Sequence, residues 1–413
     1  MSFVNSLLTI GTTKLIDAFV LDRVEGVENI EKHGAQIVIA NHGSYFDHFV
    51  LLSILRRVNK KRPVYFLTKK EAFDKPFSKW WHKNLNCIPV DRDGNATQAM
   101  LILKDKLKNE SATVVIYPEG TRTPTGEMFY GKQGAETLAY LTGVSIVPVG
   151  MHGVFDILSR KKLIPNMSVG KVSARIGEKI SISKQDRKDI ELISDRNIEK
   201  VSNLAREPLN PSRVGEFSYV DKMIETMISY NERALRNYPN SYHTPFEYYN
   251  RVLIIGQQIL KEFELSGDDK VTIFTEMARS NGRIAYESGL RTVTGKRYLK
   301  LARLYIDKAK MIRRDTPELL YVEANFYNFV GENTRFLSLM EKLVLSGHDE
   351  IKYLFALAKA KKIGNDYKGC KKVLTQIGEK HALSQVDERR KVEALALLMR
   401  IDPDIEMEIN YGA

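Results

Sequence analysis

Short β-branched runs alternate with helical patterns through the first half of the sequence. Between these runs lie helical patterns, such as those at 95–109 and 134–143. Strands that alternate with helices are typical of an α/β domain with a mostly parallel sheet. Ligands bind beyond the carboxyl ends of the strands in such sheets, so the informative residues are expected just after the runs. The runs are AQIVIA (35–40), PVYFLT (63–68), CIPV (87–90), TVVIY (113–117), SIVPV (145–149) and VSARIG (172–177).

Length and charge narrow the class of protein. A chain of 413 residues predicts two or three domains. The net charge of +12 and the pI near 9.3 favour an anionic partner, such as nucleic acid, phospholipid headgroups or a phosphorylated substrate. No apolar run reaches the roughly 18 residues of a membrane-spanning helix. The two cysteines, Cys87 and Cys370, match no metal-ligand spacing and suit a reducing cytosol.

The N-terminal segment 1–24 predicts an amphipathic helix. Apolar residues recur there at steps of three and four, while polar residues lie off the stripe. The stripe either packs on the body of the protein or lies in a membrane interface. The aromatic residues Phe77, Trp80 and Trp81 allow the same two interpretations, as core residues or as interfacial contacts. The stripe consists of Phe3, Val4, Leu7, Leu8, Leu15, Ile16, Phe19 and Val20.

A histidine and an aspartate follow the first buried run, in IANHGSYFDHFVLL (39–52). On one continuous helix His42 and Asp47 would point about 140° apart, because each residue turns roughly 100°. They meet only if His42 lies in a loop and Asp47 in the first turns of the helix, which Ser44 is placed to cap. The carboxylate would then hold the imidazole as a general base able to activate a hydroxyl. The alternative is a surface histidine and a helix-capping aspartate that never meet.

Further polar residues follow other strands. In VVIYPEGTRTPTGEM (114–128), Gly120 lets the backbone turn close to a ligand, and Arg122 offers a planar set of donors suited to phosphate. Arg92, in NCIPVDRDG (86–94), again lies just past a strand. These residues predict an anion-binding site near the histidine, although each segment alone also fits a solvated turn.

Four ordered blocks resemble the glycerolipid acyltransferases typified by bacterial 1-acylglycerol-3-phosphate acyltransferase. The blocks are NHGSYFD, CIPVDRDG, YPEGTRTPTG and VPVG, and the resemblance covers about residues 1–206. It implies an O-acyltransferase of phospholipid biosynthesis that moves an acyl chain from acyl-carrier protein or acyl-CoA to the hydroxyl of a lysophospholipid, foremost 1-acyl-sn-glycerol-3-phosphate. His42 and Asp47 of the HX4D motif would be catalytic. The acceptor site would comprise Arg92, Glu119, Gly120, Thr121 and Arg122.

Alternative functions remain open at this stage. They are acyl transfer to another lysolipid, a thioesterase-like hydrolase that activates water with the same pair, and a membrane-associated scaffold with a degenerate enzymatic half. No motif for a covalent serine nucleophile or a metal site occurs in the sequence. We therefore expect no cofactor beyond the thioester co-substrate. We also expect no nucleic-acid partner, and a cytoplasmic location on the inner face of the membrane. His48 is interpreted as structural.

The second half of the sequence predicts helices only. Prolines and a glycine in 207–216 indicate a linker between an acyltransferase domain at 25–206 and an all-helical domain at 217–413. Segments 318–344 and 351–377 align with each other, so that Val330–Gly331 falls on Ile363–Gly364. A period near 34 favours tetratricopeptide-like helix pairs over a plain bundle, and such pairs bind protein partners or self-associate.

Overall fold

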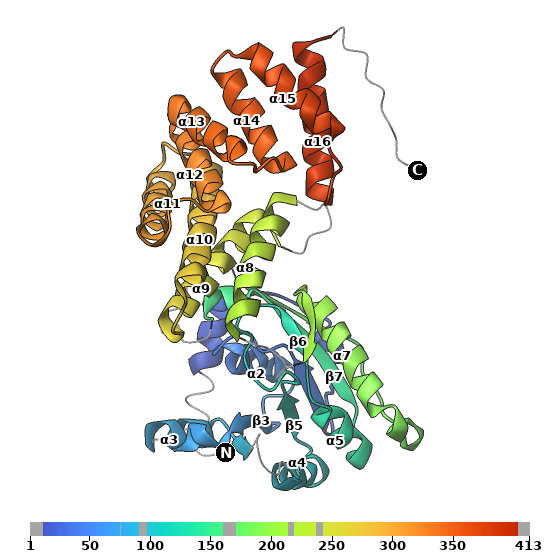
Figure 1. Ribbon diagram of the computed structural model, residues 1–413. Helices are drawn as coiled ribbons and strands as arrows, with labels where there is room; N and C mark the ends of the chain where they lie inside the picture. Colours follow the sequence, from blue (N-terminus) through green and yellow to red (C-terminus); the bar gives the residue numbers. More distant parts are fainter. Residues whose placement is uncertain are drawn as a thin grey trace. The chain divides into compact units, whose positions relative to one another are not determined.

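The computed structural model describes residues 11–74, 76–90, 97–159, 171–213, 219–236 and 243–403. The chain divides into two compact units, Met1–Lys222 and Met223–Ala413 (Figure 1). The first unit holds the strands, and the described part of the second is helical. The predicted class, an α/β domain with a mostly parallel sheet followed by an all-α region, is therefore confirmed.

A seven-stranded sheet forms the centre of the first unit. Its order is β1-β8-β7-β2-β5-β3-β4, in which the strands from β7 to β4 run parallel and β8 is antiparallel to β7. All six runs predicted as strands are strands of this sheet. The strands are β1 (Leu21–Glu25), β2 (Gln36–Ala40), β3 (Val64–Lys69), β4 (Cys87–Val90), β5 (Thr113–Ile116), β7 (Ile146–His152) and β8 (Val172–Ile176).

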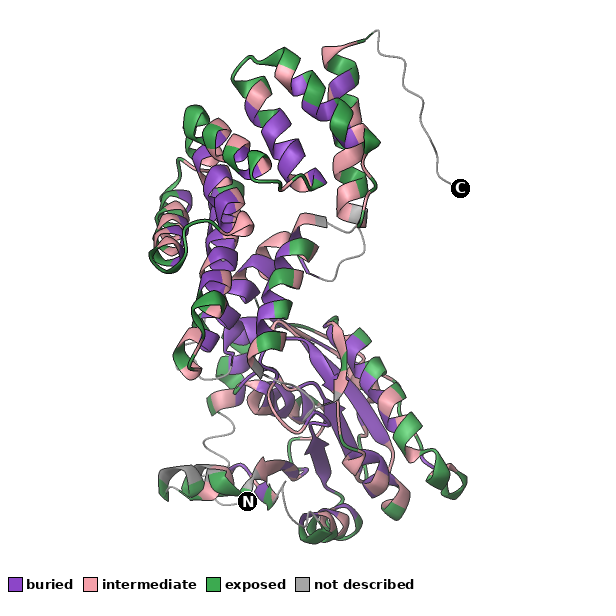
Figure 2. Ribbon diagram, viewed as in Figure 1, coloured by how far each residue is buried: buried purple, intermediate pink, exposed green. Residues whose placement is uncertain are grey.

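Two layers of helices bury the central strands on both faces, which explains why their sequences are apolar without alternation. Val38 and Ala40 of β2 pack in one core, which includes the buried residues of α2. Ile37 and Ile39 of the same strand pack in the opposite core, with α4, α5 and α7. Figure 2 shows the central strands buried between these helices. The helices are α2 (Asp47–Val58), α3 (Pro76–Asn84), α4 (Thr97–Asn109), α5 (Gly134–Thr142), α6 (Val154–Ile157) and α7 (Ile190–Ala205).

Gly150 explains why the fourth block ends in glycine. It lies in β7 against the end of α7, where an added Cβ would meet the Ala205 amide nitrogen at 2.0 Å. Only glycine allows this approach of helix to strand. The glycine of this block therefore allows the end of α7 to pack closely on β7.

Three strands were not predicted, and two of them change the expected boundaries. β9 (Leu209–Arg213) lies inside the predicted linker at 207–216 and pairs in parallel with β6 (Met128–Tyr130). β1 begins at Leu21, so the helix predicted for residues 1–24 ends earlier. The linker prediction is wrong for the residues of β9, where Pro211 lies in a short two-stranded sheet whose edge position tolerates proline.

The described part of the N-terminal stripe divides between core and solvent. Ile16 and Val20, in a π-helical turn, are buried in the core, whereas Leu15 and Phe19 are 58% and 61% exposed. Residues 1–10 lie outside the described part, and so do the side chains of Phe77 and Trp81, while Trp80 is exposed. No helix among the described residues has the length and hydropathy needed to cross a membrane.

Helix pairs form the second unit. α12 begins at Pro317 and α14 at Ile351, while α13 begins at Asn333 and α15 at Tyr367, so both helices of the pair recur at the predicted period. Gly331, at φ 82°, ends α12 in the left-handed region, whereas the aligned Gly364 ends α14 at φ −81°. The name tetratricopeptide-like stays a prediction. The helices are α8 (Tyr219–Arg236), α9 (Pro245–Glu262), α10 (Gly267–Glu287), α11 (Val293–Ile312), α12 (Pro317–Val330), α13 (Asn333–Leu345), α14 (Ile351–Ile363), α15 (Tyr367–Glu379) and α16 (Gln385–Ile401).

An ionic cluster joins three of these helices. Glu318 of α12 accepts from Arg279 of α10 at 2.5 Å, and from Tyr353 of α14 at 2.8 Å. Lys352 also pairs with it. Burial opposes the ionisation of Glu318, yet Arg279 and Lys352 lower its pKa to about 2. The carboxylate is therefore a fixed link between α10, α12 and α14.

We expect Glu318→Gln to weaken the second unit by about 1.5–3 kcal/mol at pH 7, the range for a hydrogen bond to a charged group. A carboxyl whose pKa is lowered by folding stabilises the fold while ionised, so the contribution is present above pH 4.5 and is lost toward pH 2. Urea unfolding followed by circular dichroism at pH 7 and pH 2 measures the difference. The matched control is Glu332→Gln, whose pair with Arg335 is exposed. Equal effects of the two variants would contradict the link.

Candidate active site

His42 lies in the loop that follows β2, at the carboxyl edge of the parallel strands. The neighbouring Asn41 holds this loop against β7, since its side-chain amide donates to the Met151 carbonyl and accepts from the Met151 N–H, both at 2.8 Å. α2 begins at Asp47. The loop and the helix are therefore separate elements, which is the condition the sequence sets for His42 and Asp47 to meet.

The imidazole and the carboxylate do meet. His42 Nδ1 lies 2.7 Å from Asp47 Oδ2, and the same oxygen accepts from the Ser44 N–H at 2.9 Å. Ser44 does not cap α2 as predicted: Phe46 is the N-cap residue and has no side-chain cap, and the Ser44 hydroxyl accepts from the Phe46 N–H. The hydrogen bonds that hold this loop therefore go to the Asp47 carboxylate, and the Ser44 side chain does not cap α2.

Burial governs the charge of this pair. Asp47 is fully buried, and this burial raises the pKa of its carboxyl to about 8 against the backbone donors of Ser44 and Gly43 and the charge of Arg122. The pair therefore keeps a proton between Nδ1 and the carboxyl near neutral pH. Because Nδ1 contacts Asp47, Nε2 is the ring nitrogen that faces any further proton transfer.

Glu119 holds the backbone of His42. Its side chain is buried, Oε1 accepts from the His42 N–H at 2.9 Å, and Oε2 accepts from the Phe129 N–H at 3.3 Å. Burial raises the pKa of Glu119 to about 8 despite these two donors. The His42 carbonyl in turn accepts from the Thr123 N–H at 2.8 Å. The structure places Glu119 beneath the loop of His42, so its contacts point to positioning.

Arg122 lies beside the pair. Its guanidinium carbon is 3.5 Å from the centre of the Tyr45 ring, and its charge lowers the pKa of Asp47. Its Nη1 is buried and makes no hydrogen bond within the described part of the chain. Gly120, at φ 68°, makes the left-handed turn that the sequence anticipates, and the half-buried Thr121 separates it from Arg122. Arg92 lies outside the described residues.

Tyr117 was not predicted as a site residue, although it begins the third block. Its ring stacks on His42 with the centres 4.1 Å apart and the planes 13° apart. The ring of His48 lies against those of Phe66 and Tyr117, at 4.5 and 5.3 Å. Burial lowers the pKa of His48 to about 3, so it is neutral beside His42. In the sequence, the only signal for Tyr117 is its position directly after a buried strand.

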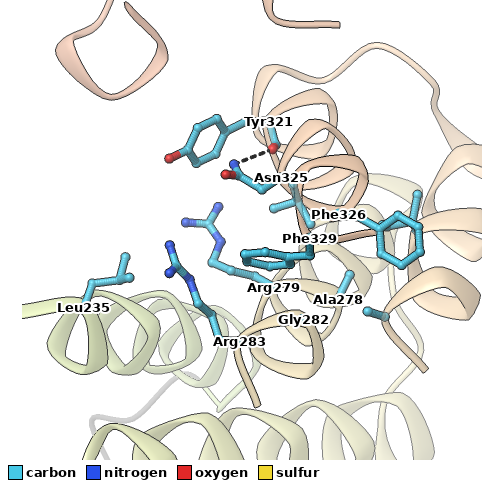
Figure 3. Close-up of a pocket in the computed structure, with 12 residues that line it drawn as sticks. Leu235, Ala278, Arg279, Gly282, Arg283, Tyr321, Asn325, Phe326 and Phe329 are labelled. Carbon is cyan, nitrogen blue, oxygen red and sulfur yellow. Dashed lines mark hydrogen bonds between the residues drawn. The ribbon is translucent and has the colours of Figure 1, made fainter. Parts of the chain in front are cut away.

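Two hollows in the described part of the second unit do not resemble a chemical site. The smaller, drawn in Figure 3, has a volume of about 30 Å³ and is lined by Arg279, Arg283, Phe329 and neighbours. That is room for about one water molecule. The larger, of about 870 Å³, is lined by Glu318 and by cations and carboxylates that pair with one another, such as Lys380 with Asp349. Further ion pairs in its lining join Arg313 to Asp268 and Arg390 to Asp387.

A histidine–carboxylate pair of this kind is chemically able to activate a hydroxyl, and comparisons with known proteins indicate a class of protein. Residues 23–152 match the family model described as Acyltransferase. This part of the chain is similar to that family, which confirms the resemblance to acyltransferases stated from the sequence.

Several curated relatives share this region. The chain is 30% identical over 137 residues to the chloroplastic 1-acyl-sn-glycerol-3-phosphate acyltransferase LPAT1 of Arabidopsis thaliana, over 33% of this chain and 37% of that protein. It is 28% identical over 167 residues to the 1-acyl-sn-glycerol-3-phosphate acyltransferase of Streptococcus pneumoniae, over 40% of this chain and 56% of the relative. The matches thus span about a third to a half of those proteins. The crystal structure of PlsC, the 1-acyl-sn-glycerophosphate acyltransferase from Thermotoga maritima, is 26% identical, with a TM-score of 0.36, over 48% of this chain and 81% of that one.

We expect Glu119→Gln to disturb the loop of His42, because an amide carries one acceptor oxygen and leaves the N–H of His42 or of Phe129 without a partner. A buried donor without a partner costs about 1–3 kcal/mol. Amide hydrogen exchange of residues 41–46 should therefore speed up about ten-fold or more, while exchange in β2 changes less. The control is Glu178→Gln, an exposed residue of the same unit. Unchanged exchange at His42 would show that Glu119 does not hold the loop.

Proposed function

We propose that this chain transfers a fatty acyl group from an acyl thioester to the free hydroxyl of a lysophospholipid, most specifically 1-acyl-sn-glycerol-3-phosphate. The observation that carries the proposal is the 2.7 Å contact between His42 Nδ1 and the buried carboxyl of Asp47. Two of the named relatives, from Arabidopsis and Streptococcus, are acyltransferases for that acceptor. The donor is acyl-carrier protein or coenzyme A, both of which present the same thioester.

The reaction needs one group that takes and returns a proton. His42 Nε2 accepts the proton of the acceptor hydroxyl as its oxygen attacks the thioester carbonyl carbon, and Asp47 stabilises the imidazolium through Nδ1. The tetrahedral intermediate then collapses, the C–S bond breaks, and the imidazolium returns the proton to the leaving thiolate. An ester forms and a thiol is released, with no covalent enzyme intermediate. The stacked Tyr117 ring limits rotation of the imidazole during both transfers.

Arg122 is suited to the phosphate of the acceptor. A buried guanidinium nitrogen without a hydrogen-bond partner in the described structure is costly unless a ligand supplies the acceptor. Phosphate oxygens match its planar donors. Gly120 and Thr121 belong to the same loop, and Arg92 joins the proposed acceptor site on the family resemblance alone.

A lysophospholipid lies in a bilayer, so the enzyme has to reach a membrane surface. We propose a peripheral location on the inner face of the membrane, supported by the exposed side chains of Leu15 and Phe19. These two residues are four apart, so they lie on one face of their helical turn while Ile16 and Val20 face the core. Such a face can enter the interface without removing core residues.

We expect His42→Ala to reduce acyl transfer at least a hundred-fold, because it removes the general base. Asp47→Asn should also reduce transfer strongly, since the amide no longer fixes the ring tautomer. Product formation with purified protein and radiolabelled acyl thioester measures both, and circular dichroism verifies the fold. His33→Ala, at an exposed histidine of the same domain, is the matched control. Near-normal turnover by folded His42→Ala protein would refute the mechanism.

We expect Arg122→Ala to raise the KM for a phosphorylated acceptor about ten-fold or more, with little change in the KM for the thioester. Arg122→Lys should restore only part of the loss, because an ammonium lacks the planar donor set. Steady-state kinetics with 1-acylglycerol-3-phosphate and with monoacylglycerol separate the phosphate contact from general effects. Arg187→Ala, at an exposed arginine, is the control. Equal losses for the two acceptors would remove Arg122 from the phosphate site.

A further inference from the structure

Helix α11 packs on its neighbours with one narrow face. Its buried residues are Gly295, Ala302, Ile306 and Ala309, which are seven, four and three residues apart. At roughly 100° per residue these positions share one side of the helix. Ile306 and Ala309 pack with Ala278 of α10 in a small core. The opposite side of α11 is therefore turned away from the body of the second unit.

That opposite side carries large aliphatic residues in solvent. Val293 is 88% exposed, Leu304 45% and Met311 84%. Between them, on the same stripe, lie the exposed cations Arg297, Lys300 and Lys308. We call these six residues the α11 outer face. The steps along it are four, three, four, four and three residues, which is the spacing of one helix face.

The cations of the outer face have no ion pair with the residues that the structure describes. Neither Arg297 nor Lys300 has an ion pair among the described residues, and Lys308 lies 5.5 Å from the centre of the Tyr305 ring. The acidic residue nearest in sequence, Asp307, is displaced from the stripe and pairs with Arg303 at 3.1 Å. The outer face is thus both cationic and apolar.

We propose that the α11 outer face binds the surface of an anionic phospholipid bilayer. Phosphate headgroups match its cations, and the acyl boundary beneath them accommodates Val293, Leu304 and Met311. The long stems of lysine and arginine allow their charges to stay at headgroup level while the helix lies flat. A nucleic acid would neutralise the same cations but would leave the aliphatic side chains in water. A protein helix docked by its apolar face would instead bury three cations.

This inference deepens the proposed function, since it gives the second unit a role at the surface where a lysophospholipid resides. The role at that surface rests on the proposed function, whereas the binding of α11 to anionic vesicles does not. Vesicle binding is measured without turnover, so it can fail while the acyl-transfer assay succeeds, and the reverse also holds.

The direct test attaches an environment-sensitive fluorophore to the full-length protein at Met311→Cys. Both native cysteines are buried, so labelling is directed to the new thiol. Vesicles of phosphatidylcholine with phosphatidylglycerol should shift the emission to the blue, whereas pure phosphatidylcholine should shift it much less. The control is Leu345→Cys, at a residue 86% exposed on α13. No shift at position 311, equal shifts at the two positions, or a shift with RNA but not with vesicles would each overturn the proposal.

A charge test separates the outer face from the general basicity of the chain. Arg297→Glu with Lys308→Glu should weaken binding to the anionic vesicles about thirty-fold or more, because each basic residue near such a surface contributes roughly a five-fold factor. The matched control is Lys368→Glu with Lys372→Glu, an equal charge change at exposed lysines of α15. Equal weakening by both pairs would overturn the proposal. Leu304→Gln with Met311→Gln should weaken the binding that persists at high salt, and unchanged binding there would overturn the apolar contribution.

Discussion

The geometry of the loop that carries His42 depends on the contact between two loops that leave neighbouring strands. β2 and β5 are parallel partners, so the loops after them emerge at the same edge of the sheet. Glu119, from the loop after β5, accepts the N–H of His42, and Thr123 donates to the His42 carbonyl. Both backbone groups of the histidine are thereby fixed before its side chain meets Asp47. One further hydrogen bond, between Nδ1 and Asp47, then sets the orientation of the imidazole.

The same burial that fixes these groups also sets their charges. Two carboxyls, Asp47 and Glu119, contact His42 through its ring and its backbone and are removed from water, which raises the pKa of each to about 8. Arg122 is the cation that opposes this rise at Asp47, while the buried His48 remains neutral. The charge of the site therefore depends on Arg122 and on the proton that Asp47 shares with His42.

The sequence predicted the buried strands well and the edges poorly, for physical reasons. Strands such as β2 and β5 are buried on both faces and therefore read as β-branched runs. β1 and β9, with sequences LDRVE and LNPSR, carry charges or a proline because little of them needs to be apolar. The His42–Asp47 contact was predictable from the loop-then-helix arrangement that the spacing requires. The positioning role of Glu119 was not, because its partners are backbone groups, and backbone groups leave no pattern in the sequence.

The second unit shows two ways in which a helical array handles charge. Within it, Arg279 and Lys352 meet the carboxylate of Glu318, so that burial costs are offset and three helices are held together. On the α11 outer face, Arg297 and Lys300 stand beside exposed aliphatic side chains and have no such partner in the described structure. Core packing does not require that arrangement, since α11 reaches its neighbours through small residues on the other side. A single exposed aliphatic residue is common on protein surfaces and needs no explanation. Three of them on one cationic stripe form a surface that would bind a partner with anionic groups at its boundary and apolar groups beneath. A phospholipid bilayer has that profile, and the proposed acceptor of the first unit is itself a component of such a bilayer.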